Sequence, residues 1–215
     1  MLSLLEQFFQ LQNQLSRLKN APGLTDLVLI PTLSNAIYLL MSITPFITMR
    51  LISEEKQQSS YSLLMSSPIK LSHIIIGKYL ASLLFFSLAI LLLALLSFSL
   101  SFTATLDIAK ISSALLALWL LTASFCAIGL YISCLSKQPH IAAISTFATL
   151  FMLWLFGSTT QTDGSNWLIQ LSLTEHSNAL FKGRLYLADI VFYISLILTL
   201  LGLSIRHLYN EQQAN

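Results

Sequence analysis

Charged residues are scarce in this sequence, and their signs nearly cancel. Eleven Lys and Arg residues stand against nine Asp and Glu residues, so 9 % of the 215 residues are charged and the formal net charge is +2. Proteins that bind nucleic acid need clustered Lys and Arg side chains to neutralise phosphates. The sequence has no such basic stripe, which argues against nucleic acid as a partner.

Cysteine is nearly absent as well. The two cysteines, Cys126 and Cys134, fall in one apolar run, where a helix would separate them by roughly 12 Å along its axis at about 1.5 Å per residue. That separation is beyond the reach of a disulfide. We therefore interpret both as packing residues.

The motifs of catalysis, nucleotide binding and metal binding are also missing. The four histidines lie far apart, at predicted helix ends or in loops, and give no metal-ligand spacing. Gly77-Lys78 is followed by Tyr79, where a phosphate-binding loop needs Ser or Thr. The apolar runs carry no Asp, Glu, His or Arg at mid-depth, which argues against proton pumps and intramembrane enzymes. Lys78, near the start of its run, is expected to extend its ammonium to the membrane surface.

Hydrophobic residues, by contrast, make up 55 % of the chain and give a mean hydropathy of +0.76. One soluble core of this length could not bury so much apolar surface. The hydrocarbon layer of roughly 30 Å needs about 20 helical residues, and the runs lack the alternation of barrel strands. We therefore predict an all-α polytopic membrane protein. Its predicted membrane helices are residues 27–49, 74–102, 111–135, 141–157 and 190–205.

Two further segments are predicted to lie at the outer membrane surface. Residues 1–25 carry an apolar stripe at helical spacing before the Pro22-Gly23 break, which indicates an amphipathic helix rather than a signal peptide. Asn166 to Phe181 favours an interfacial helix with Trp167 at headgroup level. Simple surface packing and a substrate-gating role are equally compatible with both segments.

The Lys and Arg residues of the short loops predict the orientation. With the loop of residues 50–73 in the cytoplasm, basic side chains stand at the membrane boundary on that face and acidic ones on the other. This places the N-terminus outside and the C-terminus inside. The basic residues are Arg50, Lys78, Lys137 and Arg206, and the acidic ones are Asp26, Asp107 and Asp189.

The loop of residues 50–73 concentrates charge between two apolar runs. Ser53 is suited to cap a helix whose first turn holds Glu54 and Glu55, because carboxylates oppose the positive end of the helix dipole. Pro68 would end this element. We predict a short amphipathic cytoplasmic helix held between two membrane spans, and a solvated loop helix lying on the membrane is the alternative.

Small residues recur at four-residue spacing around the run of residues 111–135. Such spacing permits close contact between helix backbones. The pattern is common in helical membrane proteins, so it indicates helix packing either within the chain or between two copies. The residues are Ala109, Ser113, Ala117, Gly129 and Ser133.

Several pieces of the sequence form a pattern through their order. They are Thr44-Pro45-Phe46-Ile47-Thr48-Met49-Arg50, Glu54-Glu55-Lys56, Leu63-Leu64-Met65-Ser66-Ser67-Pro68-Ile69, Ile76-Gly77-Lys78-Tyr79-Leu80-Ala81, Ala127-Ile128-Gly129-Leu130-Tyr131-Ile132-Ser133, and Glu175-His176 with Phe181, Gly183 and Asp189. Together they resemble the signature of type-2 ABC transporter permeases, nearest to the gliding-motility and copper-enzyme-maturation type. The similarity covers most of the chain, from about Pro22 to Arg206.

This resemblance implies a permease subunit of an ATP-driven ABC transporter in the bacterial inner membrane, with an unidentified substrate and, as in most of the family, export. It implies a second permease copy, as a homo- or heterodimer, and a separate ATPase subunit that binds ATP and Mg²⁺, so that no cofactor is expected on this chain. It also implies that the charged loop forms the coupling helix against the ATPase. The residues that inherit this role are Arg50, Glu54, Glu55, Lys56, Leu63, Leu64 and Pro68.

The sequence also departs from the family pattern. Ser59-Ser60 and Ser62 stand where the family favours Gly-Thr and Glu, which is expected to weaken or shift one ATPase contact. The family has a membrane helix ahead of the part matched by residues 1–25, so five spans are expected here instead of six. The alternative function is a non-transporting membrane scaffold, or a truncated permease that acts in the assembly of a larger complex.

Overall fold

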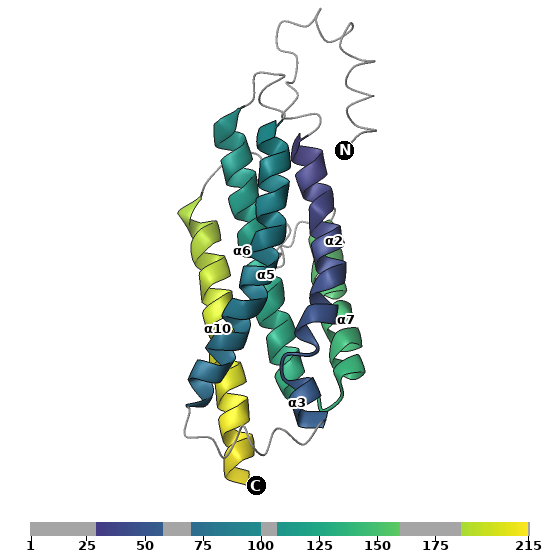
Figure 1. Cartoon of the computed structure of the whole chain (residues 1–215), viewed down its shortest axis with the longest axis vertical. Helices are drawn as coiled ribbons and strands as arrows, with labels where there is room; N and C mark the ends of the chain where they lie inside the picture. The colour runs from purple at the N-terminus through teal and green to yellow at the C-terminus, as the bar shows by residue number, and fades with distance from the viewer. Residues whose placement is uncertain (1–28, 58–69, 100–106, 160–185, 215) are drawn as a thin grey trace, which may run out of the picture.

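The computed structural model of the chain describes residues 29–57, 70–99, 107–159 and 186–214. Five long helices in these ranges run along one axis, and a short helix lies at one end of them (Figure 1). No strand occurs in the described ranges. The helices are α2 (Ile30–Thr48), α3 (Ser53–Gln57), α5 (Leu71–Ser99), α6 (Ile108–Leu135), α7 (Pro139–Thr159) and α10 (Leu187–Ala214).

Four of these helical stretches are long and apolar enough to cross a membrane: Ile30–Gln57, Leu71–Ser99, Ile108–Leu135 and Leu187–Gln213. The apolar stretch of α7, Pro139–Leu155, is shorter. The prediction of an all-α polytopic membrane protein is therefore confirmed. The segments predicted at residues 1–25 and 166–181 lie outside the described residues.

Several helices begin earlier than predicted. The predicted starts at 74, 111 and 190 are too late, since α5, α6 and α10 begin at Leu71, Ile108 and Leu187. The first turn of each helix contains a polar residue, such as Lys110 or Asp189. Hydropathy marks where the apolar residues begin, whereas backbone hydrogen bonds form equally well in a polar first turn at the membrane boundary.

The last helix is also longer than predicted. Its predicted end at residue 205 is wrong, because α10 continues to Ala214 through the polar residues after Ile205. Leu208 is buried in this extension, and Glu211 forms an ion pair with Lys56. The extension is therefore held by contacts with the rest of the chain, which hydropathy does not register.

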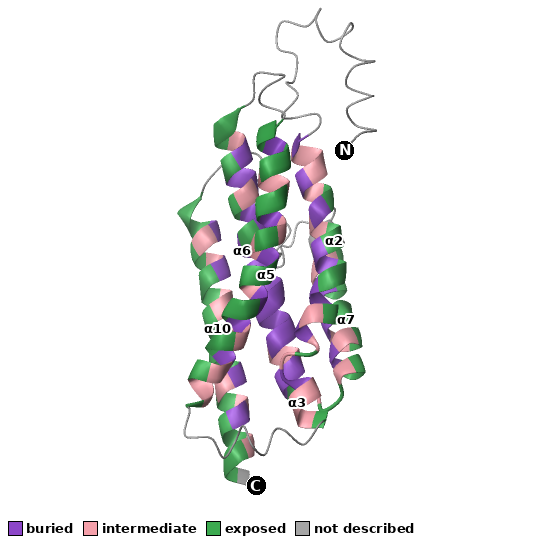
Figure 2. Cartoon of the chain, in the orientation of Figure 1, coloured by how far each residue is buried: buried purple, intermediate pink, exposed green. Residues whose placement is uncertain are grey.

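The central helix is α6. In its most apolar window 72 % of the residues are buried, against 22 % in α5 and 17 % in α10. Helices α2, α5, α7 and α10 all contact it, and Figure 2 shows buried residues concentrated along its length. Fully buried Ala114 and Ala117 allow these neighbours to approach its backbone. The core of the bundle is thus built around α6.

Helices α2 and α6 approach closely at Gly129. A Cβ atom at this position would lie 2.7 Å from Thr48 Cβ and would overlap the Thr48 hydroxyl oxygen. Thr48 is itself fully buried and donates a hydrogen bond of 2.9 Å to the carbonyl of Thr44. The absence of a side chain at residue 129 therefore sets how near the end of α2 lies to α6.

Helices α5 and α10 expose long apolar faces. Leu84 of α5 and Leu198 of α10 are 69 % and 65 % exposed. Leaving such residues in water would forgo roughly 1.5–3 kcal/mol of burial free energy for each side chain. These faces are therefore suited to lipid or to a neighbouring membrane subunit.

Candidate functional site

The short helix α3 lies directly after α2, at the end of the bundle where α7 begins and α10 ends (Figure 1). A turn joins the two helices, with Met49 N donating to Pro45 O at 2.9 Å and Leu51 N donating to Thr48 O at 3.1 Å. We call the last residue of α2, this turn and α3 together the α3 corner, residues 48–57. It includes the first four of the predicted coupling residues, whereas Leu63, Leu64 and Pro68 lie outside the described residues.

Ser53 anchors the α3 corner to α6 through Ser133. The Ser53 hydroxyl donates to the Ser133 carbonyl at 2.9 Å. The predicted cap role of Ser53 is wrong, because Ser53 is the first residue of α3 and the carbonyl of the preceding Ile52 accepts the hydrogen bond from Lys56 N. The Ser133 hydroxyl accepts hydrogen bonds from the backbone N–H groups of Ile52 and Ser53, at 3.2 and 3.1 Å, and donates to the carbonyl of Met49 at 3.2 Å. Ser53 and Ser133 are both fully buried. One small polar side chain on α6 thus provides hydrogen-bond partners for the backbone N–H and carbonyl groups of the turn between α2 and α3.

Lys56 fastens α3 to the ends of two other helices. Its Nζ donates to the Cys134 carbonyl at 2.5 Å and lies 2.7 Å from Glu211 Oε2 on α10. The Lys56 side chain is only 6 % exposed. The last carbonyls of a helix carry partial negative charge, so the C-terminal end of α6 favours a cation here. Lys56 was predicted to face the ATPase, but its ammonium is used inside the chain.

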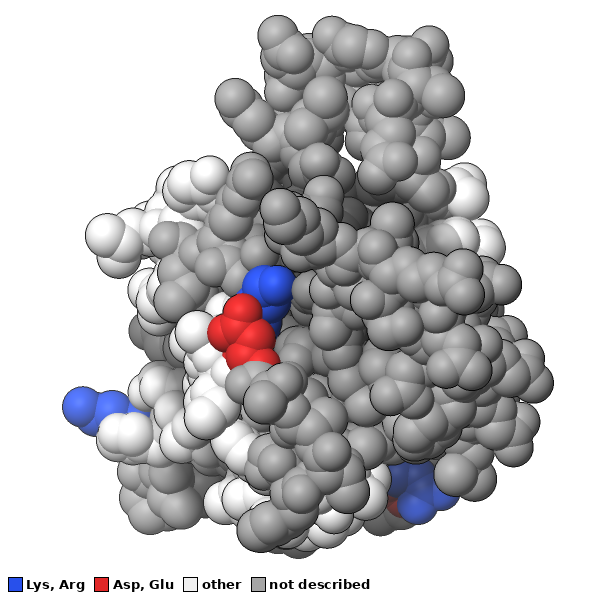
Figure 3. All heavy atoms as spheres, turned by 90° about the horizontal axis from the view of Figure 1, so that it is seen from above, with Lys and Arg blue, Asp and Glu red and all other residues white. Residues whose placement is uncertain are grey.

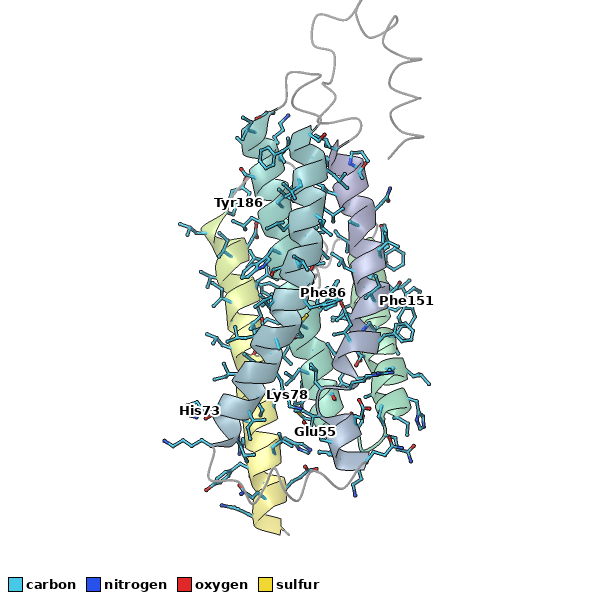
Figure 4. All side chains as sticks on the ribbon, viewed as in Figure 1. Glu55, His73, Lys78, Phe86, Phe151 and Tyr186 are labelled. Atoms are coloured by element: carbon cyan, nitrogen blue, oxygen red, sulfur yellow. The ribbon has the colours of Figure 1, made fainter. Side chains whose placement is uncertain are left out.

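Glu55 and Lys78 form a second internal connection. Lys78 Nζ lies 2.5 Å from Glu55 Oε1 and also donates to the Leu51 carbonyl. Figure 4 shows the two labelled side chains on α3 and α5. The expectation that Lys78 extends to the membrane surface stays a prediction; the ammonium reaches the α3 corner, where the Glu55 carboxylate and the Leu51 carbonyl in the turn after α2 compensate its charge.

These bonds join the α3 corner to three membrane helices. Ser133 belongs to α6, Lys78 to α5 and Glu211 to α10. A displacement of α3 must either break several bonds of partly buried groups or move these helices with it. Helix α3 is therefore mechanically coupled to these three membrane helices.

The opposite side of α3 is open. Arg50, Glu54 and Gln57 line an open pocket of about 280 Å³ together with Met49 and with Pro139 and His140 at the start of α7. Arg50 is exposed, and within the described part of the chain it makes no hydrogen bond or ion pair. The predicted coupling residues therefore divide into two sets. Glu55 and Lys56 hold α3 to the bundle, as does Ser53, which was not among the predicted coupling residues. Arg50 and Glu54 line the pocket together with Gln57, which was also not predicted.

The small residues of α6 occupy different environments. Ser113 and Ala117 are buried within the bundle, whereas Ala109 is exposed at its end. Gly129 and Ser133 both lie where α6 meets the α3 corner. At one end of α6 the small residues therefore allow close contact with α2. At the other end they allow the helices of the bundle to pack together.

The sequence pattern gave no sign of Glu211. Glu211 is 155 residues from Lys56, and an acidic residue after a last membrane helix is ordinary. Only the paired positions of α3 and the end of α10 reveal its role. Among the residues that the structure describes, no group of three His, Cys, Asp or Glu side chains could hold a metal ion.

Comparison with known proteins assigns this membrane bundle to a family. The family model of the ABC-2 family transporter proteins matches residues 5–206, and no curated protein or solved structure matches the chain. The match does not distinguish the gliding-motility type, which stays a prediction. Permeases of this family work with an ATPase partner in ABC transporters. With the family model covering nearly its whole length and membrane helices joined at a charged corner, the chain belongs to the ABC-2 transporter family and is a membrane permease component.

Proposed function

We propose that the chain is an export permease of the bacterial inner membrane, driven by a separate ATPase subunit that binds ATP and Mg²⁺ and contacts the α3 corner. A second permease copy, identical or related, completes the transporter. The observation that carries the proposal is the attachment of α3 to α5, α6 and α10 through Lys78, Ser133 and Glu211. A short helix that is attached in this way can transmit the movement of a docked subunit to several membrane spans at once.

The strength of these attachments supports this mechanism. Hydrogen bonds to charged groups contribute about 1.5–3 kcal/mol, whereas exposed ion pairs contribute about 0–1 kcal/mol. Lys56 is 6 % exposed and Lys78 is 21 % exposed, so water screens these pairs incompletely. The Ser133 bonds are fully buried. The α3 corner is therefore more rigid than a surface loop helix would be.

The character of the spans supports an amphipathic or lipid-like cargo. Tyr38 of α2 and Trp154 of α7 form an edge-to-face pair at 5.9 Å, and Phe151 lies 5.7 Å from Trp154. Tyr38 and Phe151 are about half exposed, and Figure 4 shows Phe151 pointing away from the bundle. Such an aromatic and aliphatic surface accommodates acyl chains better than free ions.

We further propose that the end of the bundle with the α3 corner faces the cytoplasm, which puts the C-terminus inside. Exposed Lys137 and Arg206 lie at this end, as the positive-inside rule requires. Figure 3 looks at the opposite end, where a basic and an acidic side chain of the described residues are visible beside each other. Cysteine introduced at Lys137 should react with an impermeant maleimide only in inverted vesicles, and cysteine at exposed Asp107 only in right-side-out cells. The reverse pattern would overturn this orientation.

The complex itself tests the function. Native chain isolated from membranes should retain a subunit that is photolabelled by azido-ATP, and Glu54→Lys with Glu55→Lys should abolish the association. A control with Asn210→Lys and Gln213→Lys adds positive charge at exposed positions of α10 and should leave it intact. If no labelled subunit accompanies the native chain, the proposal fails. If the complex hydrolyses ATP without any change at the outer end of the bundle, the scaffold function is favoured instead.

A further inference from the structure

Helix α3 uses one side to hold the bundle and leaves the other side for contact. Ser53 and Lys56 are three residues apart and make the internal bonds to α6 and α10. Glu54 and Gln57, also three residues apart in α3, lie on the pocket side, and Arg50 lines the pocket from the turn before α3. A subunit that pushes on α3 therefore meets the pocket side, because the bonded side is already occupied.

The pocket is built by two segments that are distant in sequence. Residues of the α3 corner form one wall, and Pro139 and His140 at the start of α7 form the other. Its volume of about 280 Å³ is just below the range of about 300–1,000 Å³ typical of small-molecule sites. A space of this size is suited to one or two side chains of a docked protein.

Arg50 determines the charge of the expected occupant. It is exposed and lines the pocket, and its guanidinium has no ion-pair partner within residues 29–57, 70–99, 107–159 and 186–214. A guanidinium matches a carboxylate through two parallel hydrogen bonds. An acidic side chain entering the pocket would gain such a pair.

The other pocket residues favour a protein over a lipid headgroup. Glu54 lines the same pocket, so a carboxylate acceptor stands beside the guanidinium donor of Arg50 and the pocket is not a purely cationic anion site. Gln57 offers both a donor and an acceptor, which suits polypeptide groups. Both residues belong to α3, the element that the proposed function places against the ATPase.

We infer that the pocket between the α3 corner and the start of α7 receives an acidic side chain of the ATPase subunit, with Arg50 as the residue that binds its carboxylate. The inference rests on the proposed function. It adds that the contact surface includes the start of α7, and that one ion pair across the interface fixes the docking position.

Charge variants of Arg50 test this inference in the purified complex with its azido-ATP-labelled subunit. Arg50→Glu should weaken the association at least tenfold, Arg50→Gln should weaken it less, and Arg50→Lys should weaken it least, because Lys keeps the charge but loses the paired hydrogen bonds. Arg206→Glu is the matched control: it makes the same charge change on an exposed arginine of α10 and should leave the affinity unchanged. Affinity is measured by titrating the labelled subunit onto permease in nanodiscs of neutral lipid.

Photocrosslinking adds a measurement that does not depend on affinity. A benzoylphenylalanine in place of His140 should crosslink to the ATPase subunit, whereas one in place of exposed Tyr209 on α10 should not. Equal affinities of Arg50→Glu and Arg206→Glu, or no crosslink from His140, would overturn the inference while the complex itself survives. So would an effect of Arg50→Glu that appears only in anionic nanodiscs, since a lipid headgroup would then occupy the pocket. Absence of any ATPase subunit with the native chain would instead refute the proposed function.

Discussion

Lys56 Nζ and Glu211 Oε2 lie 2.7 Å apart, although 155 residues separate them in the sequence. The pair joins the α3 corner to the last turns of α10. Lys56 also donates to the Cys134 carbonyl, so one ammonium links three helices. This contact makes the end of α10 part of the same mechanical unit as α3.

Breaking the Lys56–Glu211 pair should loosen that unit. Glu211→Gln should lower the free energy of unfolding by about 1–2 kcal/mol, because a charge-assisted bond becomes a neutral one. ATPase activity in the complex should respond less to the permease, while the two subunits still associate. Thermal unfolding in nanodiscs and ATP hydrolysis measure the two effects.

The control for this change is Gln213→Ala, at an exposed position of the same helix turn. It should alter neither the unfolding temperature nor the coupling. A Glu211→Gln variant that behaves like this control would show that the ion pair contributes nothing to rigidity.

Removal of the Ser133 hydroxyl should be costly for its size. Ser133→Ala leaves the buried N–H groups of Ile52 and Ser53 without their acceptor, which costs about 1–3 kcal/mol for each unsatisfied group. Ser87→Ala removes a hydroxyl that bonds to Leu84 O within its own exposed helix turn, and it should be nearly neutral. Chemical denaturation of both variants measures the difference, and equal stabilities would contradict the hydrogen-bonding role of Ser133.

A methyl group at Gly129 should force α2 away from α6. Gly129→Ala places a Cβ at 2.7 Å from Thr48 Cβ, so the helices must shift, at a cost of about 1–3 kcal/mol. A Cβ at Gly202 would meet no atom within 4 Å, so Gly202→Ala should be neutral or stabilise the helix by up to about 1 kcal/mol. Comparison of the two unfolding temperatures separates packing from helix propensity. If Gly129→Ala were as stable as Gly202→Ala, the close approach would be disproved.

Glu55 and Lys78 should show a coupling energy. Either Glu55→Gln or Lys78→Met alone leaves a partly buried charge without its ion-pair partner, and each should destabilise the chain by about 1–2 kcal/mol. The double variant should lose less than the sum of the two, because the second change removes the orphaned charge. A double-mutant cycle from denaturant unfolding gives the coupling directly. Strict additivity would mean that the two side chains do not interact.

Buried thiols provide a check on the central helix. Cys126 and Cys134 are both fully buried in α6. A maleimide reagent should leave them unmodified in the native membrane and should modify both after unfolding in dodecyl sulfate. Rapid labelling of the native chain, followed by mass spectrometry, would show that α6 is not the core of the bundle.

The sequence predicted much of the architecture through simple physical signals. Long apolar runs with few charges indicate membrane helices, because every backbone group must be paired in the hydrocarbon layer. The ordered motifs around Glu54-Glu55 indicated the family, which the family model over residues 5–206 confirmed. The ends of the helices were predicted less well, since polar turns at either end continue the helix beyond the apolar residues.

Tertiary structure alone decided which residues of the α3 corner bind the bundle and which line the pocket. Glu54 and Glu55 are adjacent and identical in the sequence, but a helix turns neighbouring residues by about 100°, so one faces the pocket and the other faces Lys78. Which of them faces inward depends on how α3 is set against α5 and α6. No local pattern encodes Glu211 as the partner of Lys56 or Ser133 as the acceptor for the turn. The composition determined that this chain forms membrane helices, whereas the packing of α3 on those helices determined which charges hold the bundle and which line the pocket.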